Sequence, residues 1–151
     1  MIISDSSTLI ILSDLNRFNL LCNLFSQIII PNAVYQEINA KKEIILPNFI
    51  EVCEVKNSEM VKNLNMLLDL GESQAIALAL EMNLKLIIDE KKGRKIAINQ
   101  GIKIIGLLGI IYLNIKKEFI TKNEAKVFLN NAIKNGYRIS QKLINDMFDK
   151  L

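Results

Sequence analysis

Short runs of apolar residues alternate along this chain with longer segments whose apolar positions recur at helical spacing. The apolar runs are bounded by polar or turn residues, as is typical of strands buried on both faces of a sheet. They are Ile2–Ser4, Gln27–Ile30, Phe49–Val55, Leu86–Ile88 and Lys103–Ile105. The segments between them predict helices from Ser6 or Ser7 to Leu12 and over Arg17–Leu24, Asn32–Ala40, Met60–Leu68, Glu72–Met82, Lys91–Asn99 and Gly106–Lys116. This alternation predicts an α/β fold, with a mostly parallel central sheet and helices on both of its faces.

Proline and glycine mark two helix boundaries within this pattern. Pro31 stands at a favoured first-turn position of the helix Asn32–Ala40. Gly71 follows the segment Met60–Leu68, where a glycine is a natural end for a helix. We therefore expect two separate helices, divided at Gly71.

The pattern changes at Thr121, after which no strand is expected. Thr121 and Glu124 form a capping box that opens a helix to about Lys134, and Gly136 ends that helix. Ser140 then caps a last helix, Gln141–Lys150. We expect residues 121–151 to form a helical hairpin, as an appendix of a single domain that spans residues 1–151.

The composition narrows the possible chemistry. Half of the residues are apolar, which excludes a disordered chain, and there is no histidine. Catalytic triads, histidine-bound zinc and histidine general bases are therefore excluded. The two cysteines, Cys22 and Cys53, lie in apolar segments, so we expect them to be reduced, buried packing residues.

The charge and the apolar segments bear on location and partners. Met1 leads directly into an apolar run without a basic stretch, so we expect no signal peptide. The longest apolar stretch, Ile104–Leu113, is too short to cross a bilayer. We therefore expect a cytoplasmic protein that does not enter the membrane. The net charge of +3 permits a polyanionic partner without requiring one.

Four acids stand at or near the ends of predicted strands or in the first turns of predicted helices: Asp5, Glu37, Glu72 and Asp89. Each also has an ordinary structural explanation. Asp5 and Asp89 could cap helices, Glu72 could stabilise a helix dipole, and Glu37 could be a surface residue. Strand ends of a parallel sheet converge on one edge, however, where ligands bind. The joint placement therefore favours a shared acidic site.

Clustered carboxylates repel one another and raise one another's pKa values, and a bound divalent cation removes that conflict. An all-oxygen ligand set without histidine or cysteine selects Mg²⁺ or Mn²⁺. Such an ion polarises a phosphodiester and lowers the pKa of an attacking water. The acids therefore indicate metal-dependent hydrolysis of phosphodiester bonds.

Residues beside these acids are candidates for supporting roles. Ser7 or Ser6 could orient Asp5 or a metal-bound water, or could simply cap the first helix, and Glu90 is a second carboxylate beside Asp89. A set of cations follows Asp89 directly and could hold the phosphates that flank the scissile bond, or could form a solvated helix face. These cations are Lys91, Lys92, Arg94 and Lys95.

Four segments, taken together, resemble the motifs of one family. Ile-Ile-Ser-Asp5-Ser6-Ser7 resembles the first metal-ligand motif of PIN-domain proteins, in the branch of VapC-type toxin ribonucleases. The segments from Pro31 to Glu37, from Gly71 to Ala79 and from Asp89 to Arg94 resemble the following three, in the same order. The segment Gly136–Ser140 is similar to a tail found in one subgroup. The resemblance covers nearly the whole chain. It departs at Glu72, where many relatives carry aspartate, and at Gln74, where some carry an acid.

The resemblance implies a three-layer α/β/α fold and a Mg²⁺- or Mn²⁺-dependent endoribonuclease. It implies that Asp5, Glu37, Glu72 and Asp89 bind the metal and carry out catalysis. It also implies a homodimer, a role as the toxin of a type II toxin–antitoxin pair, and a small antitoxin protein as partner.

Two alternatives stay open. One is a catalytically weak module on the same scaffold, which binds nucleic acid or a partner protein. The other is a phospho-receiver domain, which needs an aspartate at the end of its third strand. Only Glu51 and Glu54 stand near that position.

Overall fold

Five short strands form one parallel sheet in the computed structural model, which describes residues 1–151. In spatial order the sheet runs β3-β2-β1-β4-β5, and every neighbouring pair is parallel. The strands are β1 (Ile2–Ser4), β2 (Ile28–Pro31), β3 (Ile50–Cys53), β4 (Leu86–Ile87) and β5 (Ile104–Ile105). The prediction of an α/β fold around a parallel sheet is confirmed, and four of the five strands differ from their predicted bounds by one or two residues at an end.

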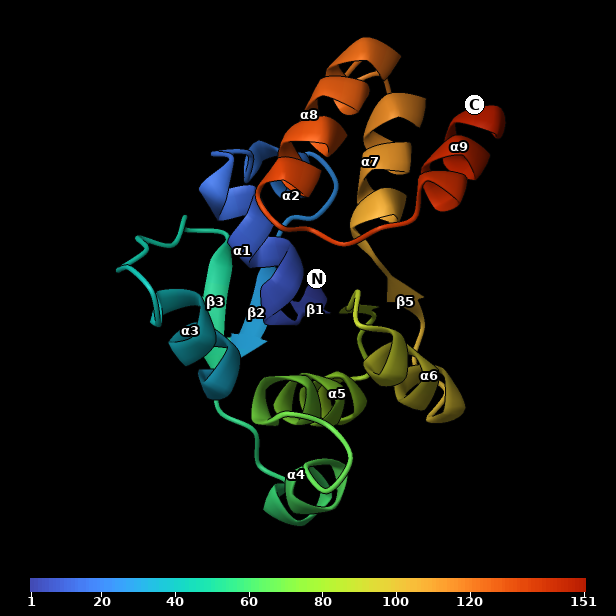
Figure 1. Ribbon diagram of the computed structural model, residues 1–151. Coiled ribbons are helices and arrows are strands. Elements are labelled where there is room, and N and C mark those ends of the chain that lie inside the picture. Colours follow the sequence, from blue (N-terminus) through green and yellow to red (C-terminus); the bar gives the residue numbers. More distant parts are fainter.

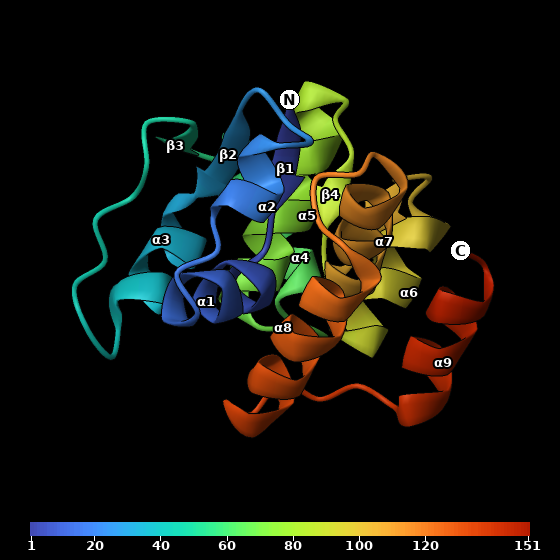
Figure 2. The ribbon, with the colours of Figure 1, turned by 90° about the horizontal axis from the view of Figure 1, so that it is seen from above.

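The chain also forms nine helices (Figure 1 and Figure 2). They are α1 (Ser6–Asp14), α2 (Asn19–Cys22), α3 (Asn32–Asn39), α4 (Ser58–Leu64), α5 (Leu70–Met82), α6 (Lys91–Asn99), α7 (Leu107–Lys116), α8 (Lys122–Lys134) and α9 (Gln141–Asp149). The chain moves outward from β1 to β3, returns to β4 beside β1, and ends at β5. The helix α3 packs against α1, β2 and β3, and α5 packs against β1, β2 and β4 as well as against α3. The helices α8 and α9 pack on α7.

The buried apolar side chains form one core of 35 residues. The central strands β1, β2 and β4 lie wholly inside it, as their continuous apolar runs predict. The prediction that every strand is buried on both faces is wrong for β3, where Glu51 and Val52 are exposed. β3 is an edge strand, so only one of its sides is paired and its cover is incomplete.

The boundary between α4 and α5 differs from the prediction at Gly71. The structure ends α4 at Leu64 and begins α5 at Leu70, so Gly71 lies in the first turn of a helix and does not end one. The reason is Asp69, whose side chain accepts a hydrogen bond of 2.8 Å from the backbone N–H of Glu72. This cap starts α5 before the glycine.

The C-terminal helices begin as predicted and end within one residue of the prediction, but they do not form a simple hairpin. The capping box of Thr121 and Glu124 opens α8, and Ser140 caps α9. Gly136 has the left-handed φ of +96° that ends α8. Both helices pack against α7, which lies between them (Figure 1). Because their apolar faces are turned toward α7, they join the main core instead of covering each other.

The expected burial of the cysteines is not observed. Both thiols are free, but Cys22 is exposed and Cys53 is half-buried. Cys22 is the last residue of the short helix α2 and faces outward, while Leu20 and Leu21 of the same turn fill the core. None of the helices is both long and apolar enough to span a bilayer.

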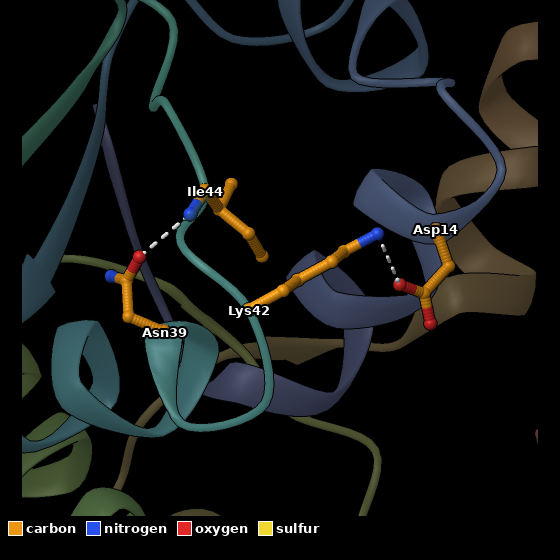
Figure 3. Close-up of polar contacts among 4 residues, drawn as sticks. All are labelled: Asp14, Asn39, Lys42 and Ile44. Carbon is orange, nitrogen blue, oxygen red and sulfur yellow. Dashed lines mark hydrogen bonds and ion pairs between the residues drawn. The ribbon is translucent and has the colours of Figure 1, made fainter.

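The irregular segment after α3 is held by two polar contacts, drawn in Figure 3. Asn39 Oδ1 accepts a hydrogen bond of 2.8 Å from the backbone N–H of Ile44. Lys42 Nζ lies 3.6 Å from Asp14 Oδ1 at the end of α1. The Lys42 side chain of this ion pair is largely exposed, so the pair contributes little stability.

A buried asparagine joins α2 to α7. The Asn114 amide nitrogen donates to the carbonyl oxygens of Leu20 and Ile110, at 2.9 and 2.8 Å, and its oxygen accepts from the Asn23 side chain at 3.0 Å. Asn114 has no exposed surface. Without its amide, the carbonyl of Leu20 would have no partner in the core.

We therefore predict that Asn114→Ala lowers the free energy of unfolding by about 1–3 kcal/mol, the usual cost of a buried polar group left unpaired. Urea denaturation monitored by circular dichroism measures this. Asn130→Ala, at an exposed position of α8, is the control and is expected to change stability by less than about 0.5 kcal/mol. Equal midpoints for the two variants would contradict the assigned role.

Candidate functional site

The carboxyl ends of β1 and β4 bring two of the predicted acids to one edge of the sheet. Ser4 pairs with Ile87 in the parallel register, and the Asp5 N–H donates to the Ile87 carbonyl at 2.9 Å. Asp5 therefore leaves the sheet beside the end of β4. Asp89 follows two residues after that end. The helices α3 and α5 then bring Glu37 and Glu72 to the same edge.

Asp5 is the most deeply buried of these acids, with 3% of the residue exposed. It occupies the N-cap position of α1, yet its side chain makes no capping hydrogen bond. Its Oδ1 atom is buried without any hydrogen-bond partner. A buried carboxylate oxygen without a partner costs folding free energy. The explanation of Asp5 as a helix cap therefore fails, and the oxygen is free for a ligand.

Ser6 and Gly71 together place Glu37. The Ser6 hydroxyl donates a hydrogen bond of 2.6 Å to Glu37 Oε2. A Cβ atom at Gly71 would overlap Glu37 Oε1, so the missing side chain lets this carboxylate lie against the start of α5. Glu37 is thus half-buried and oriented, which argues against its being an ordinary surface residue. Ser7, the other predicted supporting residue, is exposed and its hydroxyl makes no hydrogen bond within the protein.

Glu72 lies in the first turn of α5 and is 8% exposed. Its neighbour Asp69 belongs to the same acidic group, although it was not among the predicted acids. The signal for it was an aspartate three residues before Glu72, the spacing of a helix cap. Gly93 lets the start of α6 lie close to Glu72. A Cβ atom at Gly93 would lie 3.3 Å from Glu72 Oε2 and 3.5 Å from Glu90 Oε2.

Asp89 receives hydrogen bonds from three separate parts of the chain. Thr8 Oγ1 donates to Oδ2 at 2.6 Å, the Leu107 N–H donates to Oδ1 at 3.1 Å, and the Tyr137 hydroxyl donates to Oδ1 at 3.0 Å. The side chain therefore holds the start of α7 and does not cap α6. The cap of α6 is Glu90, which accepts from the Gly93 N–H at 2.7 Å. The roles of Thr8 and Tyr137 were not predicted.

The electrostatics show that the acids act on one another. The pKa of Asp5 is raised to about 7, chiefly by burial and further by the charges of Asp69, Glu37 and Asp89, against a backbone hydrogen bond with Ser6 that lowers it. Burial also raises the pKa of Glu72 to about 8, with the charges of Asp69 and Asp5 as the next causes. The acids predicted from the sequence therefore lie close enough to repel.

The donor set fits a hard divalent cation in its chemistry. All candidate ligands are carboxylate oxygens, which Mg²⁺ and Mn²⁺ prefer, and Asp5 Oδ1 is a buried oxygen without a partner. As the side chains stand, no three of them lie close enough to hold one ion together. Both oxygens of Asp89 and one of Glu37 already accept hydrogen bonds. Asp5 Oδ1 is therefore a buried oxygen that could bind a cation without giving up a hydrogen bond.

The cations predicted to hold phosphates differ in their environments. Lys92 is exposed in the first turn of α6. Arg94 is half-buried, and its Nη1 donates to the Ile88 carbonyl at 2.9 Å. The guanidinium is thereby held beside the end of β4, next to Asp89.

The raised pKa values predict how stability depends on pH when no metal is present. Between the ordinary carboxyl pKa and about pH 7–8, folded Asp5 and Glu72 keep protons that the unfolded chain has released. The free energy of unfolding therefore falls as the pH rises from about 5 to about 8. Denaturation in chelator across this range measures the slope. Asp5→Asn is expected to reduce the slope to the part that Glu72 contributes, and Asp146→Asn, at an exposed position of α9, to leave it unchanged. A wild-type stability that rises over this range would contradict the account.

The comparisons with known proteins agree with this architecture. The family model described as PIN domain, DUF3368, matches residues 1–151. No curated protein matches the chain. The PIN domain is a nuclease-type α/β fold, so the phospho-receiver alternative is wrong. The chain belongs to the DUF3368 family of PIN domains.

Proposed function

We propose that this protein is an endoribonuclease that depends on Mg²⁺ or Mn²⁺. The observation that carries the proposal is Asp5, a buried carboxylate with one unpaired oxygen at the strand-end edge of a PIN domain. Its electrostatic neighbours are three further acids, Asp69, Glu37 and Asp89. A site of this kind is unfavourable without a cation, because each carboxylate disfavours the ionised form of the others.

The residues that would hold the metal are Asp5, Glu37, Glu72 and Asp89, directly or through water. Asp69 joins them as a neighbouring charge. When bound, the ion supplies polarisation of the phosphodiester and lowers the pKa of an attacking water. No protein nucleophile is needed, which agrees with a chain that has no histidine.

The protein's own contribution is to orient these carboxylates before substrate arrives. Ser6 fixes Glu37, while Thr8 and the Leu107 N–H fix Asp89. Such outer contacts commonly set metal affinity, because they restrict how the ligands turn. Glu90 is not among the residues that would hold the metal. Its side chain caps α6, and its Oε2 and that of Glu72 both lie near Gly93.

Finer features of the proposal rest on the resemblance of the four motifs. It favours the VapC branch, in which this chain would be the toxin of a type II pair. The protein would then act in the cytoplasm as a homodimer, with a small antitoxin protein as partner. The family match over residues 1–151 supports treating the chain as one domain.

A catalytically weak module is the second candidate function. The observation that favours it is that no three acids lie close enough to hold one ion as they stand. Calorimetric titration with Mn²⁺ separates the two functions, since a module that only binds partners needs no metal site.

The central prediction concerns Asp5. Asp5→Asn keeps the size of the side chain but removes the charge, so we expect Mn²⁺-dependent RNA cleavage to fall by about 100-fold or more. Cleavage of a defined RNA by pure protein, with Mn²⁺ and with chelator, measures this. Asp146→Asn removes the same charge from the exposed face of α9 and is expected to cleave like the wild type. Cleavage by Asp5→Asn at the wild-type rate would contradict the assignment of Asp5 as a metal ligand.

A second prediction compares two adjacent serines. Ser6→Ala removes the donor to Glu37, so we expect Mn²⁺ affinity to fall by about tenfold in calorimetry. Ser7→Ala removes an exposed hydroxyl that makes no hydrogen bond within the protein, so we expect no such loss. If Ser7→Ala were the weaker binder of the two, the orienting role would belong to Ser7.

A further inference from the structure

Asp89 lines a groove that none of the other acids of the candidate metal site lines. The groove has a volume of about 710 Å³ and runs between α6, the start of α7 and the segment Gly136–Ser140 that joins α8 to α9. Figure 1 shows this connection passing the start of α7 on its way to α9. The groove and the candidate metal site share Asp89 as a common wall.

The segment Gly136–Ser140 is fixed to the site by Tyr137. Its hydroxyl donates to Asp89 Oδ1 at 3.0 Å, over a separation of 48 residues in the chain. Tyr137 is half-buried, and the burial and the adjacent Asp89 charge raise the pKa of its phenol, so the hydroxyl keeps its proton. The next residue, Arg138, is thereby placed along the groove.

The charges around this edge of the sheet are divided. The groove is lined by three cations, Lys91, Arg94 and Arg138, and by a single carboxylate, Asp89. None of the three cations forms an ion pair, since the one ion pair in the structure joins Lys42 to Asp14. The other acids of the site lie outside the groove lining. A polyanion is therefore repelled from one side of Asp89 and attracted to the other.

Gly106 lies where the acidic side of Asp89 borders the cationic groove. A Cβ atom there would lie 2.5 Å from Asp89 Oδ1 and 2.7 Å from Arg94 Nη1. With no side chain at this position, a carboxylate of the candidate metal site and the guanidinium of Arg94 lie beside the same backbone. Lys91 and Arg94 line the groove, while Lys92, the other cation predicted to hold phosphate, does not.

We propose that this groove holds a single strand of the RNA substrate, with Arg138 and Arg94 on its phosphates and the segment Gly136–Ser140 as its outer wall. The inference rests on the proposed function for its choice of RNA as the ligand. The remaining lining is largely apolar and includes Ile105, Leu108 and Ile139. Apolar surface of this kind suits unpaired bases, which a duplex keeps inside its stack.

Binding of a short fluorescent single-stranded RNA to the wild-type protein in chelator tests the inference without cleavage. We expect Arg138→Ala to weaken binding by about tenfold, the effect of losing one charge-assisted hydrogen bond. The slope of log affinity against log salt is expected to fall by about 0.7, the contribution of one phosphate contact on a single strand. Arg138→Lys keeps the charge and is expected to recover part of the affinity.

Lys62→Ala is the matched control, because it removes one positive charge from an exposed position of α4 outside the groove. Its affinity is expected to equal that of the wild type. Equal affinities and salt slopes for Arg138→Ala and Lys62→Ala would overturn the inference. Tighter binding of duplex than of single-stranded RNA would also overturn it.

This test separates the inference from the proposed function. If the protein binds RNA through Arg138 but does not cleave it with Mn²⁺, the groove inference holds and the proposed nuclease function is wrong. If the wild type and Arg138→Ala cleave RNA with the same KM, the proposed nuclease function holds and the groove inference is wrong.

Discussion

Asp5 carries a carboxylate into a place where 3% of the residue is exposed, and one of its oxygens has no hydrogen-bond partner. Burial opposes its ionisation, and the neighbouring acids oppose it further. A fold stabilised only by its core would gain by replacing such a group. Asp5 lies at the edge where parallel strands end and where ligands bind, so its burial is best explained by function. The contacts that place the other carboxylates around Asp5 are explained in the same way.

Much of the surrounding chain serves to place carboxylates. Small residues stand where elements approach an acid, as Gly71 does at Glu37 and Gly106 at Asp89. Hydroxyl and amide donors orient the acids that have partners, among them Ser6 and Thr8. Asp89 has a further role, because it joins the candidate metal site to the C-terminal segment through Tyr137. The C-terminal helices are thereby connected to the site as well as to the core.

The sequence predicted the fold class, and it predicted the acids where a local signal marks them. Asp5 and Asp89 each follow a buried apolar run, and that boundary is visible without a structure. Asp69 was missed because Gly71 was interpreted as a helix end, which hid the cap that starts α5. Tyr137 could not be predicted, since its contact with Asp89 spans 48 residues and depends on how α8 and α9 pack on α7. Local pattern predicts elements and their ends, whereas contacts between distant segments require the packed structure.

The central claim is that the unpaired oxygen of Asp5 is a ligand of a divalent cation. Crystals grown with Mn²⁺ and measured for anomalous scattering test it most directly, because the signal locates the metal without reference to activity. The account predicts an anomalous peak about 2.0–2.2 Å from Asp5 Oδ1 at the end of β1, since ions of this class bind carboxylate oxygens at such distances. A well-ordered site with no peak beside Asp5, or a peak only at surface carboxylates, would contradict it.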